Sequence, residues 1–497
     1  MGSIQISIVP VEDSIEEIIA VLKEDFEIGG EDVIEIESEL SDLIDQMVTT
    51  LYVVIETSYV DKFYRDSYYT YFASKHREYK RDCVRLSYFK DEITDEHFRN
   101  PKLFDVLQEL FLGYSILRPT VPRIVGRSII NKNAFTDNDM MICTYKSNVL
   151  VNGVKLEISG FPHSSQDSES ITCAETTIWG LMEYFGNRYA DYRPIAISGI
   201  ISVLTKYSKK RMLPSAGLTV DQISYAIKEF GFGTYLYSRE DAYEDAIENV
   251  IGIYVESGIP VLAALENTEV GHAILVVGYE QESEIKFESQ KTRNLEYHDK
   301  IISYVDYTDV ERKYVIQDDN LHPLQKVLLS KPDQPYIDKG LDEWRNVKID
   351  SVIVPLYRRI YLEAEMAKEL ALNILKDKDL GFQFDNQFVF RFYLTSSRSF
   401  KHHIAILEDI DDILANELIL QKMPKFIWVA EMYQKDDYQG NLATGLIVID
   451  ATEASQNAKD AVLAAMYPDR CIFKSGSDFV TLDQILTRYY RFQNNLT

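Results

Sequence analysis

Apolar positions near the start of the chain recur first with a helical period and then with the period of a strand. Residues 15–26 (IEEIIAVLKEDF) and 37–48 (ESELSDLIDQMV) place apolar side chains three and four positions apart, which predicts two helices. Residues 51–60 (LYVVIETSYV) predict a strand, and the tyrosine-rich residues 62–82 predict a helix whose rings cover a core. We therefore expect residues 1–155 to form an N-terminal α+β segment.

A hairpin is the clearest local prediction in the chain. Residues 140–159 (MMICTYKSNVLVNGVKLEIS) contain two alternating runs joined by Asn152 and Gly153. An Asn-Gly pair favours the two-residue turn between antiparallel strands, because both residues tolerate a positive φ angle. Upstream, residues 111–130 predict strand interrupted by two prolines.

The middle segment, residues 156–357, combines helices with strands that follow them. Residues 176–187 (TTIWGLMEYFGN) are apolar enough to predict a buried helix. A second helix is predicted over residues 217–232, where Thr219 and Gln222 have the spacing of a capping box. The remaining predictions are a helix at 197–208, strands at 257–265, 272–280, 313–319 and 347–357, and an acidic, polar insertion before the third of these strands.

The C-terminal segment, residues 358–497, is also α+β. An amphipathic helix is predicted over residues 361–377 and a helix over residues 457–467. Strands are predicted at 387–397, 425–433 and 445–452. The whole chain is therefore predicted to be an α+β protein.

Length and charge narrow the classes of protein. A chain of 497 residues is too long for one hydrophobic core, so two to three domains are expected. The net charge of -27 argues against a protein that binds nucleic acid, which needs a basic surface for the phosphate backbone. The same charge disfavours docking on an anionic membrane. We expect neither nucleic acid nor membrane among the partners.

The termini and the cysteines indicate a cytoplasmic protein. The first residues, MGSIQISIVPVEDSIEEI, lack a basic stretch followed by an apolar one, so no secretory leader is expected. No apolar run approaches the length of a membrane span. Cys83, Cys143, Cys173 and Cys471 are far apart and form no CxxC pair, which predicts free thiols rather than a zinc site or a disulfide framework.

Cys173 opens a helix and is the candidate nucleophile. The unpaired N–H groups and the dipole at a helix start favour an anion such as a thiolate, and Thr172 can cap the helix. His272 follows Gly271 at the start of a strand and can exchange a proton with a thiol. Asp318 ends the next strand, from which a carboxylate can reach a histidine on a neighbouring strand. Gln166, in the polar loop before the cysteine, can donate to a developing oxyanion.

These residues resemble a known family. SQDSESITCAETTIW, then SGIPVLAALENTEVGHAILVVGYE, then YVIQDD are similar to the peptidase C39-like branch of the papain-like cysteine peptidase fold. The resemblance covers about residues 160–320. It implies a papain-like core over residues 156–357, with Cys173 as nucleophile, His272 as general base and acid, Asp318 as orienting residue and Gln166 as oxyanion donor. It implies no cofactor and no metal, and a peptide or protein as substrate.

The chain departs from the family pattern at several positions. Gln166 lies seven residues before Cys173, where six is more usual, so the loop must accommodate one more residue. Ala174 stands where glycine is common, and Glu175 would disfavour a thiolate if it lay close to the sulfur. Asp318 is followed by Asp319 and Asn320 rather than by proline, so any of these three can be the orienting residue.

Other readings of the same residues stay open. A cysteine before an apolar helix is most often a core residue, and a Gly-His pair is often a plain turn. Arg118, Arg123 and Arg127 surround the two prolines and are expected to form structural salt bridges. The function expected is that of a thiol-dependent hydrolase, most simply a cysteine peptidase that cleaves a peptide or isopeptide bond. The alternatives are an acyl transferase or deamidase with the same triad, and a non-catalytic binding module.

Overall fold

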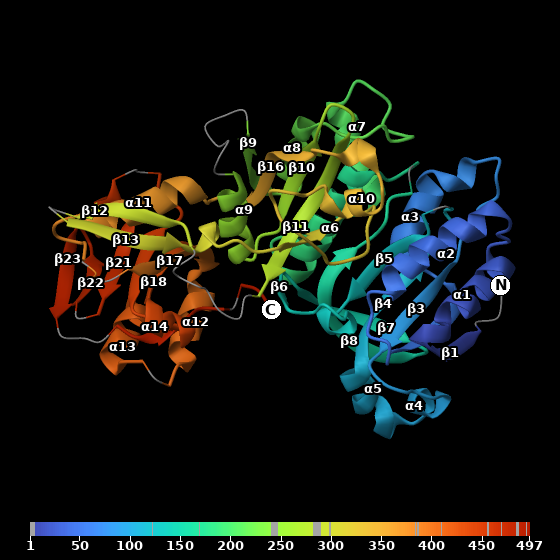
Figure 1. Ribbon diagram of the computed structural model, residues 1–497, viewed down its shortest axis with the longest axis horizontal. Coiled ribbons are helices and arrows are strands. Elements are labelled where there is room, and N and C mark those ends of the chain that lie inside the picture. The colour runs from blue at the N-terminus through green and yellow to red at the C-terminus, as the bar shows by residue number, and fades with distance from the viewer. Residues whose placement is uncertain are drawn as a thin grey trace. The chain divides into compact units, whose positions relative to one another are not determined.

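The chain is an α+β protein that forms two compact units (Figure 1). Unit 1 comprises Met1–Gly231, Leu262–Val277 and Tyr314–Ile353, and unit 2 comprises Phe232–Val261, Gly278–Lys313 and Val354–Thr497. The structure is a computed structural model, and it describes residues 5–497 except 122, 168, 240–246, 282–289, 298–299, 383, 385–386, 409, 455–456, 469, 484–486 and 494. Residues 1–155 belong to the same unit as Cys173.

A seven-stranded sheet forms the N-terminal part of unit 1. Its strands pair antiparallel, and helices α1 (Ser14–Asp25) and α2 (Glu31–Ile44) cover one of its faces (Figure 1). The strands are, in spatial order, β1 (Ile6–Pro10), β2 (Tyr52–Tyr59), β3 (Cys83–Phe89), β4 (Phe111–Leu117), β5 (Val125–Ile130), β8 (Val154–His163) and β7 (Tyr145–Val151). Short helices α3 (Lys62–Thr70), α4 (Asp95–Arg99) and α5 (Phe104–Leu110) complete this part.

Strands β7 and β8 form the hairpin that the Asn-Gly pair predicts. Val151 pairs with Val154, and the intervening Asn152 and Gly153 have φ angles of 44° and 84°. Both angles lie in the left-handed region that a tight hairpin turn requires. The prediction is confirmed, because the turn chemistry is local and needs no information from the rest of the chain.

Helix α6 (Cys173–Arg188) is the central helix of unit 1. Side chains around its whole circumference are buried from Ala174 to Met182, which is typical of a helix enclosed by other elements. Gly180 permits a close approach to the sheet, because a Cβ atom there would lie 3.3 Å from the Leu275 side chain. Helices α7 (Ile197–Tyr207) and α8 (Val220–Glu229) follow, and the capping box of Thr219 and Gln222 forms as predicted.

A second sheet carries the residues that lie opposite α6. Strand β11 (Gly271–Glu280) lies between β10 (Val261–Glu266) and β14 (Tyr314–Gln317), and β6 (Met140–Ile142) also pairs with it. Beyond β14 the sheet ends with β15 (Gln325–Val327). Beyond β10 it continues with β16 (Lys348–Tyr357) and ends with β9 (Phe232–Ser238). Helix α10 (Gln334–Asp338) and the 3-10 turn Asp342–Trp344 lie in the connection from β15 to β16. The predicted strands of the middle segment therefore assemble into one sheet.

The polar insertion between His272 and Asp318 contributes strands to unit 2. Within it, β12 (Thr292–Tyr297) and β13 (Lys300–Asp306) form a hairpin, and β13 pairs in parallel with β17 (Phe388–Ser396). The sheet continues with β18 (Phe426–Gln434), β20 (Gly445–Asp450), β21 (Val462–Tyr467), β22 (Arg470–Ser475) and β23 (Asp478–Asp483). Strands β19 (Leu442–Ala443) and β24 (Tyr489–Tyr490) pair separately. The helices of unit 2 are α9 (Ile247–Glu256), α11 (Ala364–Lys376), α12 (Ser397–Ile406), α13 (Asp412–Leu420), α14 (Lys435–Gln439) and α15 (Ala458–Ala461).

Two helix predictions are wrong in part. The helix predicted over residues 457–467 ends at Ala461, and Val462–Tyr467 is a strand buried on both faces. A short, continuous apolar run carries no period that separates a buried strand from a buried helix. The helix predicted over residues 62–82 ends at Thr70 and is followed by a 3-10 turn.

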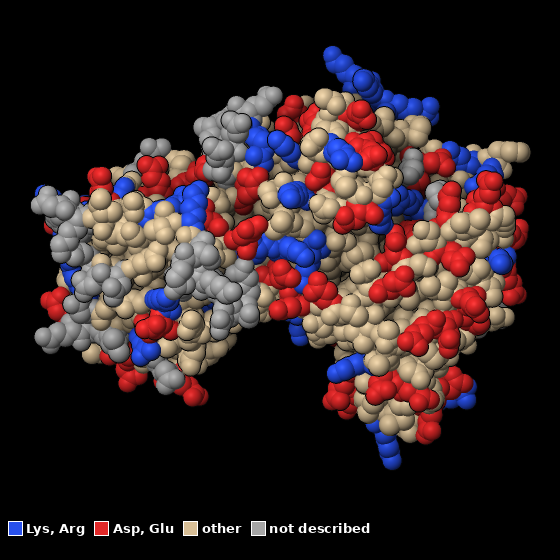
Figure 2. All heavy atoms as spheres, viewed as in Figure 1, with Lys and Arg blue, Asp and Glu red and all other residues tan. Residues whose placement is uncertain are grey.

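The surface of unit 1 is rich in acidic side chains. They gather over the face that carries α1 and α2 (Figure 2). Among the described residues, no helix has both the length and the apolar character that a membrane span requires.

Candidate active site

Cys173 is the first residue of α6 and lies between the two residues of the capping box at the start of this helix. Thr172 and Glu175 form a capping box, in which the Thr172 hydroxyl donates to Glu175 Oε2 at 2.5 Å and its N–H donates to the same oxygen at 3.2 Å. The Ser215 hydroxyl donates to the other oxygen, Oε1, at 2.7 Å. The Glu175 carboxylate therefore serves the helix start and Ser215, and Cys173 stays partly exposed.

His272 lies between Cys173 and Asp318. Its Nε2 atom is 2.9 Å from Asp318 Oδ1, so Nδ1 is the ring nitrogen that this bond leaves free for proton exchange. Burial opposes protonation of the ring, but the charge of Asp318 and hydrogen bonds with Asp318 and Cys173 outweigh it, so the His272 pKa lies well above its usual value. The structure thus brings together three residues that are 99 and 46 positions apart in the chain, as the predicted order of elements requires.

Asp318 is fully buried, and both of its oxygens accept hydrogen bonds. Besides His272, Oδ1 accepts from the Asn320 N–H at 3.0 Å, and Oδ2 accepts from the Tyr336 hydroxyl at 2.6 Å. Burial alone would raise the Asp318 pKa, but the charge of His272 and these hydrogen bonds lower it. Asp318 is therefore held as a carboxylate beside the ring.

Asp319 is a second buried carboxyl group near the same ring. Its Oδ1 atom is 3.8 Å from His272 Nε2, which is beyond hydrogen-bond distance. The nearby Thr176 hydroxyl donates to the Thr172 carbonyl at 2.9 Å, and no described residue donates a well-formed hydrogen bond to Asp319. Burial, together with the charge of Asp318, raises the Asp319 pKa to about 7 against the opposing effect of His272. Of the three residues considered for the orienting role, Asp318 makes the direct contact with the imidazole.

Gln166 lies next to this group through Asn320. Its Nε2 atom donates to Asn320 Oδ1 at 2.6 Å, which uses one of the two amide N–H groups and leaves the other. Buried Arg118 fixes the backbone here by donating to the carbonyls of Ser165 and Gln166 at 2.7 and 3.1 Å. Gln166 is thus anchored from two sides.

The longer loop between Gln166 and Cys173 folds around Asp167. Asp167 Oδ1 accepts from the N–H groups of Glu169, Ser170 and Ile171 at 2.9, 2.7 and 2.8 Å. A short side chain that satisfies successive backbone donors stabilises a tight turn. This turn accommodates the seven-residue spacing between Gln166 and Cys173.

Two aromatic residues cover the imidazole, and sequence reasoning missed both. The rings of Tyr336 and Trp344 stack with their centroids 3.5 Å apart, and the Trp344 ring meets the His272 ring edge-on at 5.3 Å. Both aromatic residues lie in the connection between β15 and β16. No periodic pattern marks them, because each belongs to a short turn of helix whose position depends on tertiary packing.

The three arginines near the prolines have different roles. Arg127 forms the predicted salt bridges, at 3.2 Å to Asp61 and 3.6 Å to Glu183. Arg118 binds backbone carbonyls instead, and Arg123 donates to the Asn320 carbonyl at 3.4 Å. Two of the three therefore support the site rather than the general fold.

The same cluster has the donor atoms of a cation site. One atom each from His272, Asp318 and Asp319 lies within 4.8 Å of the others. However, His272 and Asp318 face each other at hydrogen-bond distance, and the Tyr336 hydroxyl occupies the second oxygen of Asp318. A metal ion would have to displace these bonds, so the arrangement favours proton transfer over metal binding. His322, four residues after Asp318, lies outside this cluster, and its Nδ1 atom is 2.9 Å from the Pro323 carbonyl.

Comparison with known proteins adds no relative from which a role can be taken. No family model matches the chain, and a search of curated proteins finds no match.

Proposed function

We propose that the chain is a thiol-dependent hydrolase with a papain-like core, a cysteine peptidase that cleaves peptide or isopeptide bonds. Cys173 is the nucleophile, His272 the general base and acid, Asp318 the orienting residue and Gln166 an oxyanion donor. The observation that carries the proposal is the His272 ring, whose Nε2 atom lies 2.9 Å from the Asp318 carboxylate and whose pKa is raised in part by the Cys173 thiol at the start of α6.

The reaction follows from these contacts. His272 Nδ1 accepts the thiol proton, and the Cys173 sulfur attacks the carbonyl carbon of the substrate. The carbonyl oxygen takes up negative charge, and the free amide N–H of Gln166 and the unpaired N–H at the start of α6 can donate to it. The C–N bond breaks as His272 returns its proton to the leaving amine. Water, deprotonated by the same ring, then hydrolyses the thioester and restores the thiol.

The charges around the sulfur support its activation. A protonated His272 ring and the start of α6 both stabilise a thiolate electrostatically, and Asp318 in turn stabilises the protonated ring. The Glu175 carboxylate, which would otherwise disfavour a thiolate, is turned toward Thr172 and Ser215 and accepts hydrogen bonds from them.

The arrangement of elements supports a papain-like core. Helix α6 carries the thiol, and a mainly antiparallel sheet carries the imidazole on β11 and the acid directly after the end of the adjacent strand β14. Gly180 of α6 packs against Leu275 of β11, which holds the two parts of the site in register.

The alternatives share part of this chemistry. An acyl transferase or deamidase would use the same groups with a different acceptor or substrate, so a trial of amine acceptors against water separates it from a peptidase. A binding module with no activity would tolerate a histidine out of reach of the sulfur. The effect of the Cys173 thiol on the His272 pKa indicates that the two side chains interact, which favours the catalytic alternatives.

An electrophilic peptide probe tests the proposal. We expect the parent protein to be modified at Cys173 and the variants Cys173→Ala and His272→Ala to react much more slowly or not at all. Cys173→Ala should keep its Tm within a few degrees of the parent, because truncation of a partly exposed side chain leaves little cavity. Equal labelling of parent and Cys173→Ala, or unfolding of Cys173→Ala, would overturn the proposal.

A further inference from the structure

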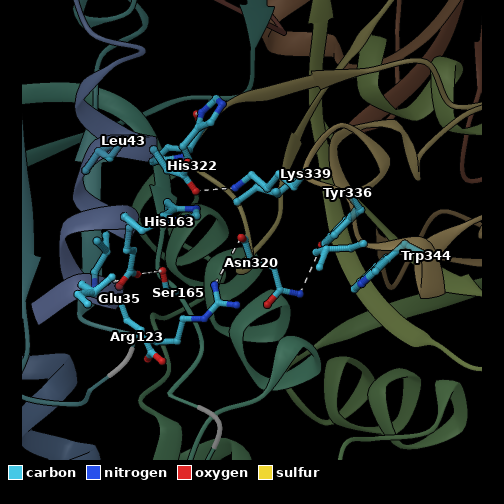
Figure 3. Close-up of a pocket in the computed structure, with 18 of the residues that line it drawn as sticks. Glu35, Leu43, Arg123, His163, Ser165, Asn320, His322, Tyr336, Lys339 and Trp344 are labelled. Atoms are coloured by element: carbon cyan, nitrogen blue, oxygen red, sulfur yellow. Dashed lines mark hydrogen bonds and ion pairs between the residues drawn. The ribbon is translucent and has the colours of Figure 1, made fainter. Parts of the chain in front are cut away.

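A hollow of about 730 Å³ lies beside the proposed catalytic residues in unit 1. One wall is helix α2, and the opposite wall is the chain that follows β14, together with α10 and the turn that carries Trp344 (Figure 3). Its volume falls in the range of pockets that bind small ligands or side chains. Helix α2 lies outside the stretch that resembles the peptidase family, so this hollow is a feature of the present chain.

The hollow begins at the residues that support the catalytic group. Tyr336 and Asn320 line it, and they bind Asp318 and Gln166 respectively. Trp344 lines it as well, and the same ring packs edge-on against His272. A polypeptide that crosses the active site therefore needs only two or three extended residues, at about 3.3–3.6 Å each, to reach this space.

Its position indicates which part of a substrate it receives. The acyl part of the substrate becomes bonded to Cys173, and the leaving amine takes its proton from His272. Tyr336 and Trp344, which cover the His272 ring, line the hollow, and Cys173 is not among its described lining residues. It therefore lies on the leaving-group side of the scissile bond.

The charges that line the hollow are predominantly acidic, but several are already paired. Glu39 accepts from the N–H groups of Ile124 and Val125 at 2.8 and 3.3 Å, and from the Ser165 hydroxyl at 2.9 Å. Asp42 pairs with Lys339 at 2.5 Å. These contacts compensate the acids along the floor and one side of the hollow.

Two acids at the mouth differ from these. Glu35 of α2 and Glu343 beside Trp344 are exposed, and neither carboxylate forms a hydrogen bond or ion pair among the interactions of the described residues; the Glu343 backbone carbonyl accepts from Asn267 Nδ2 at 2.9 Å. Ile34 and Leu341 lie close to them in the chain, also line the hollow and expose 70% and 37% of their surface, so apolar side chains accompany the two carboxylates. An apolar stem with a cationic head is the side chain that such a mixture fits, as in arginine or lysine.

We propose that this hollow binds a basic side chain of the substrate on the leaving-group side of the scissile bond, with Glu35 and Glu343 facing its charge. The inference rests on the proposed peptidase function for its direction but not for the binding itself. It makes the substrate a polypeptide with arginine or lysine within a few residues after the cleaved bond.

Binding to the inactive Cys173→Ala protein tests the site without catalysis. The probe is a set of fluorescein-labelled alanine hexapeptides with arginine, glutamine or glutamate placed at each position in turn, and the readout is anisotropy. We expect arginine at one or two adjacent positions to bind about 10-fold more tightly than glutamine, and this preference to weaken as salt rises. Equal affinity of the three sets would overturn the inference.

Substitutions locate the preference. In Glu35→Gln/Glu343→Gln the advantage of arginine should fall about 3- to 10-fold, since two facing charges are removed. Glu37→Gln is the matched control, because Glu37 is an exposed residue of the same helix that lies outside the lining. An arginine preference that survives the double substitution places the binding elsewhere and also overturns the inference.

Digestion of the same peptides by the parent protein assigns the side. Mass spectrometry should find arginine after the cleaved bond, and arginine before it would overturn the assignment. If the parent reacts with the electrophilic probe but the inactive protein shows no arginine preference, the hollow is not the subsite although the chain is a thiol enzyme. If the inactive protein prefers arginine peptides but the parent does not react at Cys173, the site for a basic side chain stands and the proposed peptidase function is wrong.

Discussion

Each unit buries two acidic side chains beside one cationic side chain, but the two groups differ in how completely the acidic oxygens are hydrogen-bonded. In unit 2, Arg391 lies between two buried acids, with its Nε atom 2.7 Å from Glu256 Oε1 and its Nη1 atom 2.6 Å from Glu431 Oε2. Glu431 also accepts from the Tyr393 hydroxyl at 2.9 Å and the Tyr489 hydroxyl at 3.2 Å. Both oxygens of Glu431 are thus satisfied, and an arginine stands between the two acids.

The group around His272 has the same number of acids but fewer hydrogen bonds to them. Two buried carboxyl groups face a single imidazole, and only Asp318 forms hydrogen bonds with its neighbours. Asp319 stays without a well-formed donor among the described residues, and its pKa is raised to about 7. In unit 2 the only acidic oxygen of the three-residue network without a hydrogen bond among the described residues is Glu256 Oε2, whereas in unit 1 both oxygens of Asp319 lack one. The larger deficit therefore lies beside the proposed catalytic residues, where perturbed carboxyl groups are often found.

Removal of the central cation of unit 2 should have the largest effect on stability. Arg391→Ala leaves two buried acids without compensation, and the free energy of unfolding should fall by about 3–5 kcal/mol. Urea denaturation measures it. Arg488→Ala is the control, because the exposed pair of Arg488 with Asp437 at 2.9 Å should contribute under about 1 kcal/mol. Similar losses in both variants would show that the buried network has no special weight.

The two aspartates of unit 1 should differ in their effect on rate. Asp318→Ala should lower the rate of reaction with an electrophilic peptide by about 10- to 1000-fold, because His272 loses its orienting bond. Asp319→Ala should have a much smaller effect, since its carboxylate is 3.8 Å from the ring. Rates under saturating probe decide between them, and the opposite ranking would assign the orienting role to Asp319.

The cysteines should differ in their reactivity with a small alkylating reagent. At neutral pH, Cys173 should be modified at least about 10-fold faster than the others, because it is partly exposed and contacts His272. Burial raises the pKa of Cys83 well above its usual value and that of Cys143 to about 12, and Cys471 is fully buried. Peptide mapping after brief iodoacetamide treatment gives the order. A protected Cys173 would mean that it is a core residue.

The smaller effect on stability concerns the surplus acid and the pH. Because the folded state raises the Asp319 pKa from 3.8 to about 7, folded Asp319 binds a proton between these values that the unfolded chain releases. Its contribution to stability therefore falls as the pH rises from about 4 to 7. Asp319→Asn cannot titrate, so between pH 5 and 8 it should gain on the order of 2–3 kcal/mol relative to the parent.

Thermal unfolding of parent and variant at the two pH values checks this difference. His272 and Asp318 titrate in both proteins, and the charge of Asp319 helps to raise the His272 pKa, so the difference between the two profiles reports Asp319 together with its coupling to His272. A parent and variant with parallel pH profiles would show that Asp319 carries no surplus charge.

Local chemistry explains which parts of the fold could be predicted. The Asn152–Gly153 turn and the cap of α6 depend on residues within a few positions of one another, and both form as predicted. The prediction of a helix over residues 462–467 is wrong. This segment is a strand because it pairs with β20 and β22, which are its neighbours in the sheet. Propensity within one segment does not contain that information.

The candidate site shows the same division. The contacts of His272 with Cys173 and Asp318 follow from the order of a helix and two strands, which the sequence shows. The stacked cover of Tyr336 and Trp344 could not be predicted, because two short turns place it far along the chain from the residues that it covers. The wall that α2 supplies to the hollow depends on packing between segments almost 300 residues apart.

The turn after β14 has a consequence for how this protein can change over generations. Four successive residues reach separate parts of the site: Gln317 is 2.9 Å from His163, Asp318 is 2.9 Å from His272, Asp319 is 3.8 Å from the same ring, and Asn320 accepts from Gln166 at 2.6 Å. A single-residue insertion or deletion here would shift all of these side chains away from their partners at once, whereas a substitution would affect only one. Insertions and deletions should therefore be rarer in residues 317–320 of evolving sequences than next to any one of the residues that they contact.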